Sequence, residues 1–275
     1  MNRISIDVLL PVGLNSPHLK EAIESILSQD FTNWKLFILI DVGNPSTKLI
    51  KSLVPSAKLK IVEFEETFNL SKRLNSGMKL GSSKYIARMD ADDVSHKNRF
   101  SAQAQFLQST GFSLIGSSAL VINEAGNSIS NIRVTASIND IKRNLLRKNQ
   151  FLHPTLMFRR DVIQNVQYNP LLSYAQDYGF ILEVARIFEI SNIAENLLSY
   201  RIHDANHSNK RISFDEMKII GKLKFELSTD LGASQLSYIF WHLLWVIKNV
   251  FFSLITSLNL RLVLRRFSGR KLRFE

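Results

Sequence analysis

Three carboxylates lie within four positions in the stretch ARMDADDVS, at Asp90, Asp92 and Asp93. They directly follow the apolar run KYIARM, which is typical of a buried strand. Like charges at this spacing repel one another and raise each other's pKa, so they need either a positive charge among them or a solvated turn. Carboxylates one residue apart can bind Mg²⁺ or Mn²⁺, which water and substrate phosphates then complete. The alternative is a solvated acidic turn at a helix N-terminus.

The elements that would position these acids alternate between strand and helix patterns over the first hundred residues. Strands are predicted at the apolar runs ISIDVLLPV, WKLFILID, KLKIVEF and KYIARM. Helices are predicted at SPHLKEAIESILSQ, with Ser16 as N-cap, at PSTKLIKSLV, and at NLSKRLNSGMKLG, which ends at Gly81. This alternation predicts an α/β fold with a Rossmann-like, mostly parallel sheet flanked by helices.

The carboxyl ends of parallel strands form the edge at which open α/β sheets bind ligands. Pro11 and Asp41 end the first two strands, and the acidic stretch follows the fourth, so we expect them to border one crevice.

After residue 100 the alternation loosens. Helices are predicted at NRFSAQAQFLQST, INDIKRNLLRK and QDYGFILEVARIF, strands at FSLIGSSALVIN, HPTLMFRR and ISNIAENLLSYRIH, and a hairpin turn at EAGNSIS.

The composition limits the kind of protein this can be. The 275 residues are 45% hydrophobic and 21% charged, which suits a globular chain with a buried core, and they include no cysteine. A disulfide scaffold, a thiolate metal site and a thiol nucleophile are therefore excluded. The N-terminal stretch MNRISIDVLLPV is too weakly apolar for a signal peptide and has no cleavage pattern, which predicts a cytoplasmic protein.

The C-terminal quarter is strongly basic. From Lys210 onward the chain has twelve Lys or Arg and five acids, so seven of its eleven net positive charges lie there. Nucleic acid and an anionic membrane surface are the two partners that such a patch suits, and we predict the membrane and no nucleic acid. We accordingly divide the chain into a domain at 1–210 and a helical, basic extension at 211–275.

Residues 236–260 could reach across a bilayer, at ~20 residues per crossing, but Lys248 falls near their middle. A central Lys opposes insertion by roughly 2.5–3.5 kcal/mol. A narrow polar stripe also recurs every three or four residues, at Tyr238, His242, Trp245, Asn249, Ser253 and Thr256. The pattern predicts a helix lying in the membrane interface, and the alternative is a helix packed on its own domain or on a second subunit.

Six stretches in order together resemble the family 2 glycosyltransferases of GT-A fold, which are common in bacterial polysaccharide synthesis. The stretches DVLLPV, LKEAIESILSQDFTNWKLFILID and NLSKRLNSGMKLGSSKYIARMDADD are similar to the family's first strand, its next helix and strand, and its D-x-D region. HPTLMFRRDVI, YAQDYGFILEVA and LLSYRIH follow in the family's order. The resemblance covers about residues 5–205 and favours a metal site over a solvated turn.

The resemblance implies a role for each matching position. Asp92 and His203 would bind the divalent cation, Mn²⁺ or Mg²⁺, and the imidazole fits Mn²⁺ better. Asp177 would be the catalytic general base that takes the proton of the acceptor hydroxyl in an inverting displacement, and an N-cap is its alternative role. The nucleotide-sugar contacts would be Pro11, Asp41, Lys72, Asn75, Asp90 and Arg201.

Some of these roles have a plain alternative. Asp93 would support the D-x-D pair or cap the next helix, and Arg201 would face the diphosphate or pair with an acid. Lys72 and Asn75 would lie near the diphosphate or on a solvated helix face. His153 would line the acceptor side.

The sequence also departs from the family's pattern. Val42 stands where a second acid is common, the first strand leads into Gly13 rather than Tyr-Asn, and Gln176 precedes Asp177 in place of Glu. These changes put the details of base recognition in doubt, but they remove no group that the chemistry requires.

The sequence therefore predicts an inverting, metal-dependent glycosyltransferase. It would move a sugar from a nucleotide-diphosphate donor, a UDP-sugar first of all, to a glycan or lipid-linked acceptor at the inner face of the cell membrane, and a homodimer is compatible with it. The rivals are a degenerate glycan-binding scaffold subunit and a nucleotidyltransferase. A nucleotidyltransferase would be expected to carry a basic, Gly-rich loop after the first strand. The stretch at that place, PVGLNSPH, has a single Gly and no Lys or Arg.

Overall fold

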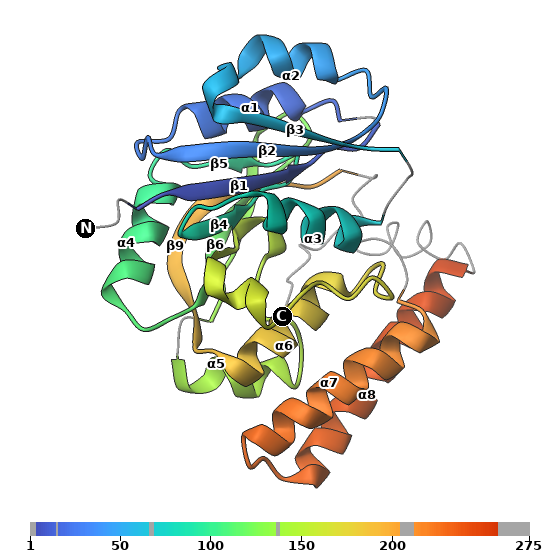
Figure 1. Cartoon of the computed structure of the whole chain (residues 1–275). Coiled ribbons are helices and arrows are strands. Elements are labelled where there is room, and N and C mark those ends of the chain that lie inside the picture. The colour runs from blue at the N-terminus through green and yellow to red at the C-terminus, as the bar shows by residue number, and fades with distance from the viewer. Residues whose placement is uncertain (1–3, 15, 66–68, 136–137, 204–211, 258–275) are drawn as a thin grey trace.

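The N-terminal half forms the alternating strands and helices that the sequence predicts (Figure 1). The computed structural model describes residues 4–14, 16–65, 69–135, 138–203 and 212–257. The strands of this half are β1 (Ile6–Pro11), β2 (Trp34–Asp41), β3 (Leu59–Phe64), β4 (Tyr85–Arg88) and β5 (Val94–Ser95). Its helices are α1 (Leu19–Leu27), α2 (Thr47–Leu53), the 3₁₀ turn η1 (Ser56–Lys58), α3 (Leu70–Leu80) and α4 (Arg99–Ser109).

The second half is more irregular, as its looser pattern predicts. Its strands are β6 (Leu114–Ile122), β7 (Ser128–Ile132), β8 (Met157–Arg159) and β9 (Ile190–Arg201). Its helical segments are α5 (Ile138–Leu145), η2 (His153–Thr155), η3 (Arg160–Gln164), α6 (Gln176–Ile187), α7 (Phe214–Asp230) and α8 (Gln235–Ser257). The predicted hairpin joins β6 to β7, and Gly126 in its turn has a φ of 85°, which glycine adopts without strain.

The strands form one sheet in the order β3-β2-β1-β4-β8-β6-β9-β5, with β7 paired to β6. β1 to β4 are parallel to one another, whereas β8 is antiparallel to both β4 and β6. The α/β, GT-A-type architecture that the sequence predicts is confirmed. The parallel half places the carboxyl ends of β1, β2 and β4 at one edge, where the acidic stretch begins.

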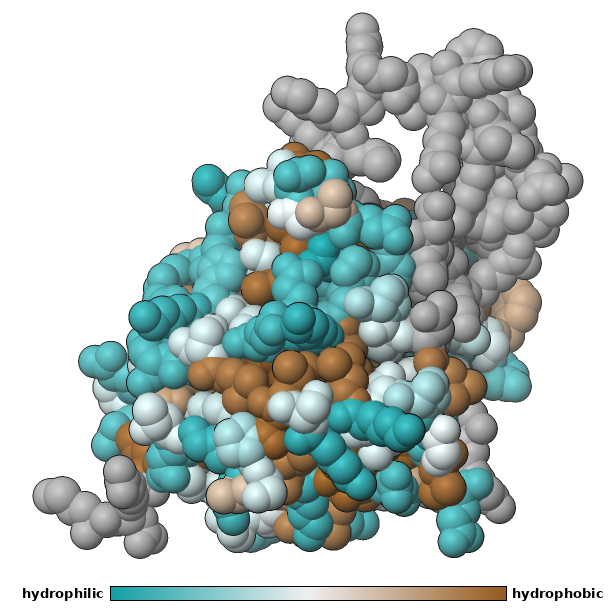
Figure 2. All heavy atoms as spheres, turned by 90° about the horizontal axis from the view of Figure 1, so that it is seen from above, coloured by the Kyte–Doolittle hydropathy of each residue, from teal (hydrophilic) through white to brown (hydrophobic). Residues whose placement is uncertain are grey.

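Helices cover both faces of the sheet, and each face has its own hydrophobic core. Along β2, Leu36, Ile38 and Ile40 pack with α1, α2 and α4, while Phe37 and Leu39 pack with α3 and the helices of the second half. This alternation is the two-residue period of a strand buried on both sides. Seen from above, the face over α1 and α2 is mostly hydrophilic, with one band of apolar atoms across it (Figure 2).

Two local predictions are wrong. Helix α1 begins at Leu19 with His18 as its N-cap, and the hydroxyl of Ser16 instead donates to the carbonyl of Gly13. The stretch HPTLMFRR is not one strand, because Pro154 lies in the 3₁₀ turn η2 and only three residues pair in β8. Proline has no amide hydrogen to give to a sheet.

Helices α7 and α8 form an antiparallel pair that extends from the body of the molecule (Figure 1). A capping box of Ser213 and Glu216 begins α7. Within the residues that the structure describes, no helix combines the length and apolar character needed to cross a membrane. The predicted domain boundary at 210 and 211 and the basic stretch after α8 lie outside those residues.

Candidate active site

The acidic stretch is a short loop between β4 and β5. Strand β5 pairs antiparallel with β9, Val94 opposite Ser199, so the loop is held against the opposite half of the sheet. At its start, the amide of Met89 donates to the carbonyl of Leu9 over 3.0 Å. The loop is therefore anchored at both ends rather than free in solvent.

The three carboxylates of the loop face one another. Asp90, Asp92 and Asp93 each have an oxygen within 4.8 Å of the others'. Burial and the charge of Asp90 raise the pKa of Asp92, and the same causes, with the charge of Asp92, raise that of Asp93 well above its usual range. One carboxylate oxygen of Asp93 is buried without a hydrogen-bond partner. A bound cation would relieve this repulsion, so the donor set fits the divalent ion that the sequence predicts.

His203 lies against this group, as the resemblance predicts. Its Nε2 is 2.9 Å from Oδ2 of Asp92, and its ring lies 6.3 Å from the ring of His18 at the start of α1. An imidazole and carboxylates on one ion suit Mn²⁺ better than Mg²⁺. Asp92 and His203 could therefore share a metal ion, and the rings of His18 and His203 cover that side of the loop.

Arg201, at the end of β9, lies buried behind the loop. Its amide donates to Asp93 over 2.8 Å, and its Nε donates to the carbonyl of Asp92 over the same distance. Its other nitrogens bind Glu21 and the carbonyls of Asn123 and Glu124. These contacts give Arg201 the second of its two expected roles, pairing with an acid, and they correct the expectation that it faces the diphosphate. Asp93 likewise supports the loop and caps no helix, since the N-cap of α4 is Asn98.

Two further arginines lie beneath the loop. Arg88, the last residue of β4, forms an ion pair with Asp90 and is 3% exposed. The fully buried Arg99 donates to the carbonyl of Arg88 over 2.7 Å. Burial lowers the pKa of Arg99 to about 9, against the opposing charge of Asp93. Arg88 is thus the positive charge that the opening motif required, and it is the cation inside ARMDADD itself.

Asp177 lies in the first turn of α6, where it accepts a hydrogen bond from Nδ2 of Asn149 over 2.9 Å. It is not the N-cap, which is Ala175. Burial raises the pKa of Asp177, the charge of Arg88 lowers it and the charge of Asp90 raises it. Because both charges act on the Asp177 carboxyl, that carboxyl lies close to Arg88 and Asp90 in the fold.

A hydrogen-bonded pair, His153 and Tyr168, belongs to the same region. Nε2 of His153 is 2.9 Å from the hydroxyl of Tyr168. Burial and the charge of Arg88 lower the pKa of His153 well below its usual range, so its imidazole is neutral at pH 7. Burial raises the pKa of Tyr168, whose hydroxyl also interacts with the charges of Arg88 and Asp177. The pair therefore lies near both Arg88 and Asp177.

The residues that the resemblance assigns to the nucleotide lie at the ends of β1 and β2 and on α3. Asp41 ends β2 and forms an ion pair with Arg73 of α3, and Pro11 ends β1. Lys72 is exposed on α3. The side-chain amide of Asn75 donates to the carbonyl of Tyr168 over 2.8 Å and accepts from its amide over 2.9 Å. Asn75 therefore joins α3 to the Tyr168 segment, which differs from the expected diphosphate contact.

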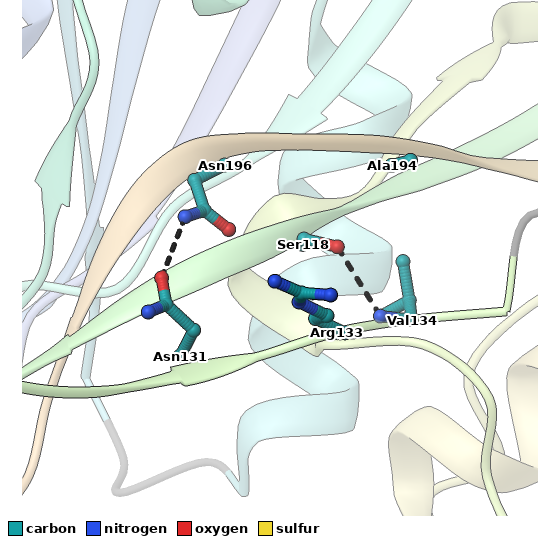
Figure 3. A pocket seen from close by; sticks show the side chains of 6 residues that line it. All are labelled: Ser118, Asn131, Arg133, Val134, Ala194 and Asn196. Carbon is teal, nitrogen blue, oxygen red and sulfur yellow. Dashed lines mark hydrogen bonds between the residues drawn. The ribbon is translucent and has the colours of Figure 1, made fainter.

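A small cavity of about 310 Å³ lies elsewhere, between β6, β7 and β9 (Figure 3). Its polar wall includes a hydrogen bond of 2.7 Å between the side chains of Asn196 and Asn131. None of the predicted site residues lines this cavity, so it is separate from the acidic loop.

Comparisons with known proteins identify the family. The profile of glycosyl transferase family 2 matches residues 7–166, more than half of the chain. The chain belongs to this family. It is 30% identical over 218 residues to the O-antigen biosynthesis glycosyltransferase WbnJ of Escherichia coli, covering 77% of this chain and 85% of that one. It is 26% identical over 207 residues to the amylovoran biosynthesis glycosyltransferase AmsE of Erwinia amylovora, covering 73% and 76%.

Solved structures support the fold. The crystal structure of Staphylococcus aureus TarS 1–349 in complex with UDP-GlcNAc superimposes with a TM-score of 0.67 at 15% identity, over 82% of this chain and 67% of that one. Membership of family 2 makes this chain a glycosyltransferase. The family profile contains the acidic loop, whereas Asp177 and His203 lie beyond its matched residues.

Sequence reasoning missed three residues of the site in this family 2 chain: Arg88, Asn149 and Tyr168. Arg88 could have been found, because a cation inside a strand-like run next to three acids has to be paired if it is buried. No sequence pattern marks Asn149 or Tyr168. Asn149 follows α5 and Tyr168 precedes α6, and only tertiary packing brings these two loops to the site.

The buried contacts of Arg201 predict its effect on stability. Arg201→Met removes the donors to the carbonyls of Asp92, Asn123 and Glu124, so the free energy of unfolding should fall by about 2–5 kcal/mol. Denaturant unfolding measures this loss. Arg159→Met is the control, because the ion pair of Arg159 with Asp161 is partly exposed and should be worth less than ~1 kcal/mol. Equal losses in the two variants would contradict the role given to Arg201.

Proposed function

We propose that this family 2 enzyme transfers a sugar from a nucleotide-diphosphate donor to an acceptor hydroxyl, with inversion at the anomeric carbon, in the synthesis of a cell-surface polysaccharide. The observation that carries the proposal is that Asp177 and the acidic loop face one charged region around Arg88. The polysaccharide assignment is supported by the O-antigen and amylovoran enzymes to which the chain is similar.

Asp177 is the general base of the proposed reaction. It takes the proton from the acceptor hydroxyl as the hydroxyl oxygen bonds to the anomeric carbon of the donor. The bond from that carbon to the diphosphate breaks at the same time, and the nucleoside diphosphate leaves with the electron pair. The side-chain amide of Asn149 donates to Oδ2 of Asp177, which orients the carboxylate.

Asp92 and His203 are the residues that would hold a divalent ion, with Asp90 and Asp93 beside them. When bound, such an ion supplies positive charge to the departing diphosphate. Asp90, paired with Arg88, lies beside this group and would contact the ribose or the sugar. Arg88 and Arg201 fix the two ends of the loop, so its carboxylates keep their positions before the donor arrives.

The donor proposed first is a UDP-sugar. Pro11 and Asp41 would border the base, and Asp41 would accept one of its N–H groups. TarS was solved with UDP-GlcNAc and with UDP, which makes uridine diphosphates the natural first compounds to test. The acceptor proposed is a glycan or a lipid-linked saccharide, with the enzyme on the cytoplasmic face of the membrane.

Thermal unfolding with nucleotides tests the donor site. We expect UDP with Mn²⁺ to stabilise the full chain, by about 2.7 kcal/mol at a ligand concentration of one hundred times Kd. UDP alone and Mn²⁺ alone should give smaller shifts, and UMP with Mn²⁺ should fall short because it lacks the second phosphate. If no nucleoside diphosphate raised the melting temperature with either Mn²⁺ or Mg²⁺, the scaffold alternative would replace this proposal.

A further inference from the structure

The outward face of α8 is apolar, which is unusual for a helix on the surface of a protein. Six large hydrophobic side chains on it are between 42% and 79% exposed. They recur at the spacing of one helical face: Leu236, Ile239, Phe240, Leu243, Leu244 and Ile247. A contiguous exposed apolar surface of this kind marks an interaction site.

Three residues of the polar stripe, Tyr238, His242 and Trp245, face the protein instead. The hydroxyl of Tyr238 donates to the carbonyl of Gly221 over 2.9 Å, and the ring of Tyr238 stacks on that of His242. One turn further on, the ring of Trp245 lies 4.2 Å from the buried amine of Lys224 and packs near Tyr178. The helix thus uses its polar side for its own domain and keeps its apolar side for another partner.

The charge around this face points to an anionic partner. Helix α8 contains no acid, and Lys248 is exposed beside Ile247. The sequence then continues with six Lys or Arg and one Glu over residues 258–275. At the edge of the face, the guanidinium of Arg147 lies 3.9 Å from the ring centre of Trp241. Apolar side chains flanked by Trp, Lys and Arg are the composition that binds the interface of an anionic bilayer.

A second copy of the chain suits this face less well. Two α8 helices packed face to face would add positive charge to positive charge, since α8 has no acid and is flanked by Lys248 and Arg147, and this repulsion would oppose the pair. A bilayer with anionic headgroups instead meets the positive charges with negative ones.

We propose that the face of α8 formed by these six side chains binds the surface of an anionic lipid bilayer. It deepens the proposed function, since a lipid-linked acceptor would then be presented at the same surface. The end of α8 lies on the side of the molecule where β1 and β2 end (Figure 1). The rings of Trp245 and Tyr178 are in contact, which packs α8 against α6, the helix that carries Asp177.

Vesicle flotation with the full chain tests this surface. The native protein should float with phosphatidylcholine vesicles that contain phosphatidylglycerol, and far less with pure phosphatidylcholine. High salt should weaken the binding, because the Debye length falls from ~10 Å at 0.1 M to ~3 Å at 1 M. The double variant Leu243→Ser with Ile247→Ser should reduce the vesicle-bound fraction at least about tenfold, since it removes two inserted side chains.

A matched control carries the same changes elsewhere. Ile129→Ser with Ile187→Ser alters two side chains of similar exposure, on β7 and at the end of α6, and should float like the native chain. Native-like flotation of the α8 variant, or equal binding to neutral and anionic vesicles, would overturn the proposal. So would a native dimer in light scattering that the α8 variant converts to monomer while neither protein binds vesicles.

Turnover measured in solution separates this inference from the proposed function. The α8 variant should hydrolyse or transfer the donor sugar without vesicles as the native enzyme does. If the native chain bound vesicles but no nucleoside diphosphate, the membrane-binding surface would stand and the proposed reaction would be contradicted. If it turned over the donor but did not float with vesicles, the proposed reaction would stand and the membrane-binding surface would be contradicted.

Discussion

Replacing Asp177 with Asn is expected to lower kcat by about 10²–10⁴-fold while the Kd of the donor changes little. The amide that replaces the carboxylate cannot take the acceptor proton, yet it has nearly the same shape and leaves Asn149 and Tyr178 in place. Initial rates at saturating donor measure the loss, and calorimetric titration of the nucleoside diphosphate measures the binding. A turnover close to the native value would remove Asp177 from its role as base.

Asp215→Asn is the matched control. Asp215 is the second residue of α7 as Asp177 is the second residue of α6, so both variants lose one negative charge from a helical first turn. Asp215 is highly exposed and pairs only with Lys218 in the contacts that the structure describes. We expect native turnover from this variant, which would show that the loss at Asp177 comes from its place in the site and not from the helix dipole.

The carboxyl of Asp177 also predicts how kcat depends on pH. A general base acts in its deprotonated form, so activity should fall as the pH drops through its pKa. Burial raises the pKa of Asp177, so the acidic limb of the kcat profile should lie above the range of an ordinary aspartate. A profile that stays flat down to pH 4 would mean that another group takes the proton.

Replacing Asp92 with Asn is expected to abolish the dependence of donor binding on divalent ions. The neutral amide is a much weaker ligand than a carboxylate, and His203 loses the charged partner of its Nε2. In thermal unfolding, UDP with Mn²⁺ should then stabilise the variant no more than UDP alone. The exposed Asp30→Asn, which changes the same group outside the loop, should keep the native response.

The metal-free Asp92 variant should be at least as stable as the native chain. The pKa of Asp92 is raised in the folded state, so this group stabilises the fold at low pH, and that contribution is lost as the pH rises through the folded pKa. At neutral pH, the Asn variant lacks the negative charge of Asp92, which repels those of Asp90 and Asp93 in the native chain. A marked fall in its melting temperature without metal would show that Asp92 is a structural residue, and a retained Mn²⁺ response would exclude it as a ligand.

The alternating half of the fold could be predicted because each strand and helix there is marked by its own local pattern. The runs WKLFILID and KYIARM are mostly apolar, and residues 36–40 and 85–88 within them are buried, as a parallel strand covered on both faces requires. The start of α1 could not be predicted in the same way. Ser16 and Pro17 are a common beginning for a helix, yet the chain turns once more before His18, and the hydroxyl of Ser16 binds the carbonyl of Gly13.

The sequence by itself determined the acidic loop, the strand that precedes it, and the family. Tertiary structure alone decided which groups Arg201 and Asn75 donate to, and that Asp177 lies near Arg88 and Asp90. It also decided that Tyr238, His242 and Trp245 of α8 face inward. The physical reason is that periodicity states which residues share a face of an element, whereas the partner of that face is chosen by packing between segments far apart in the chain.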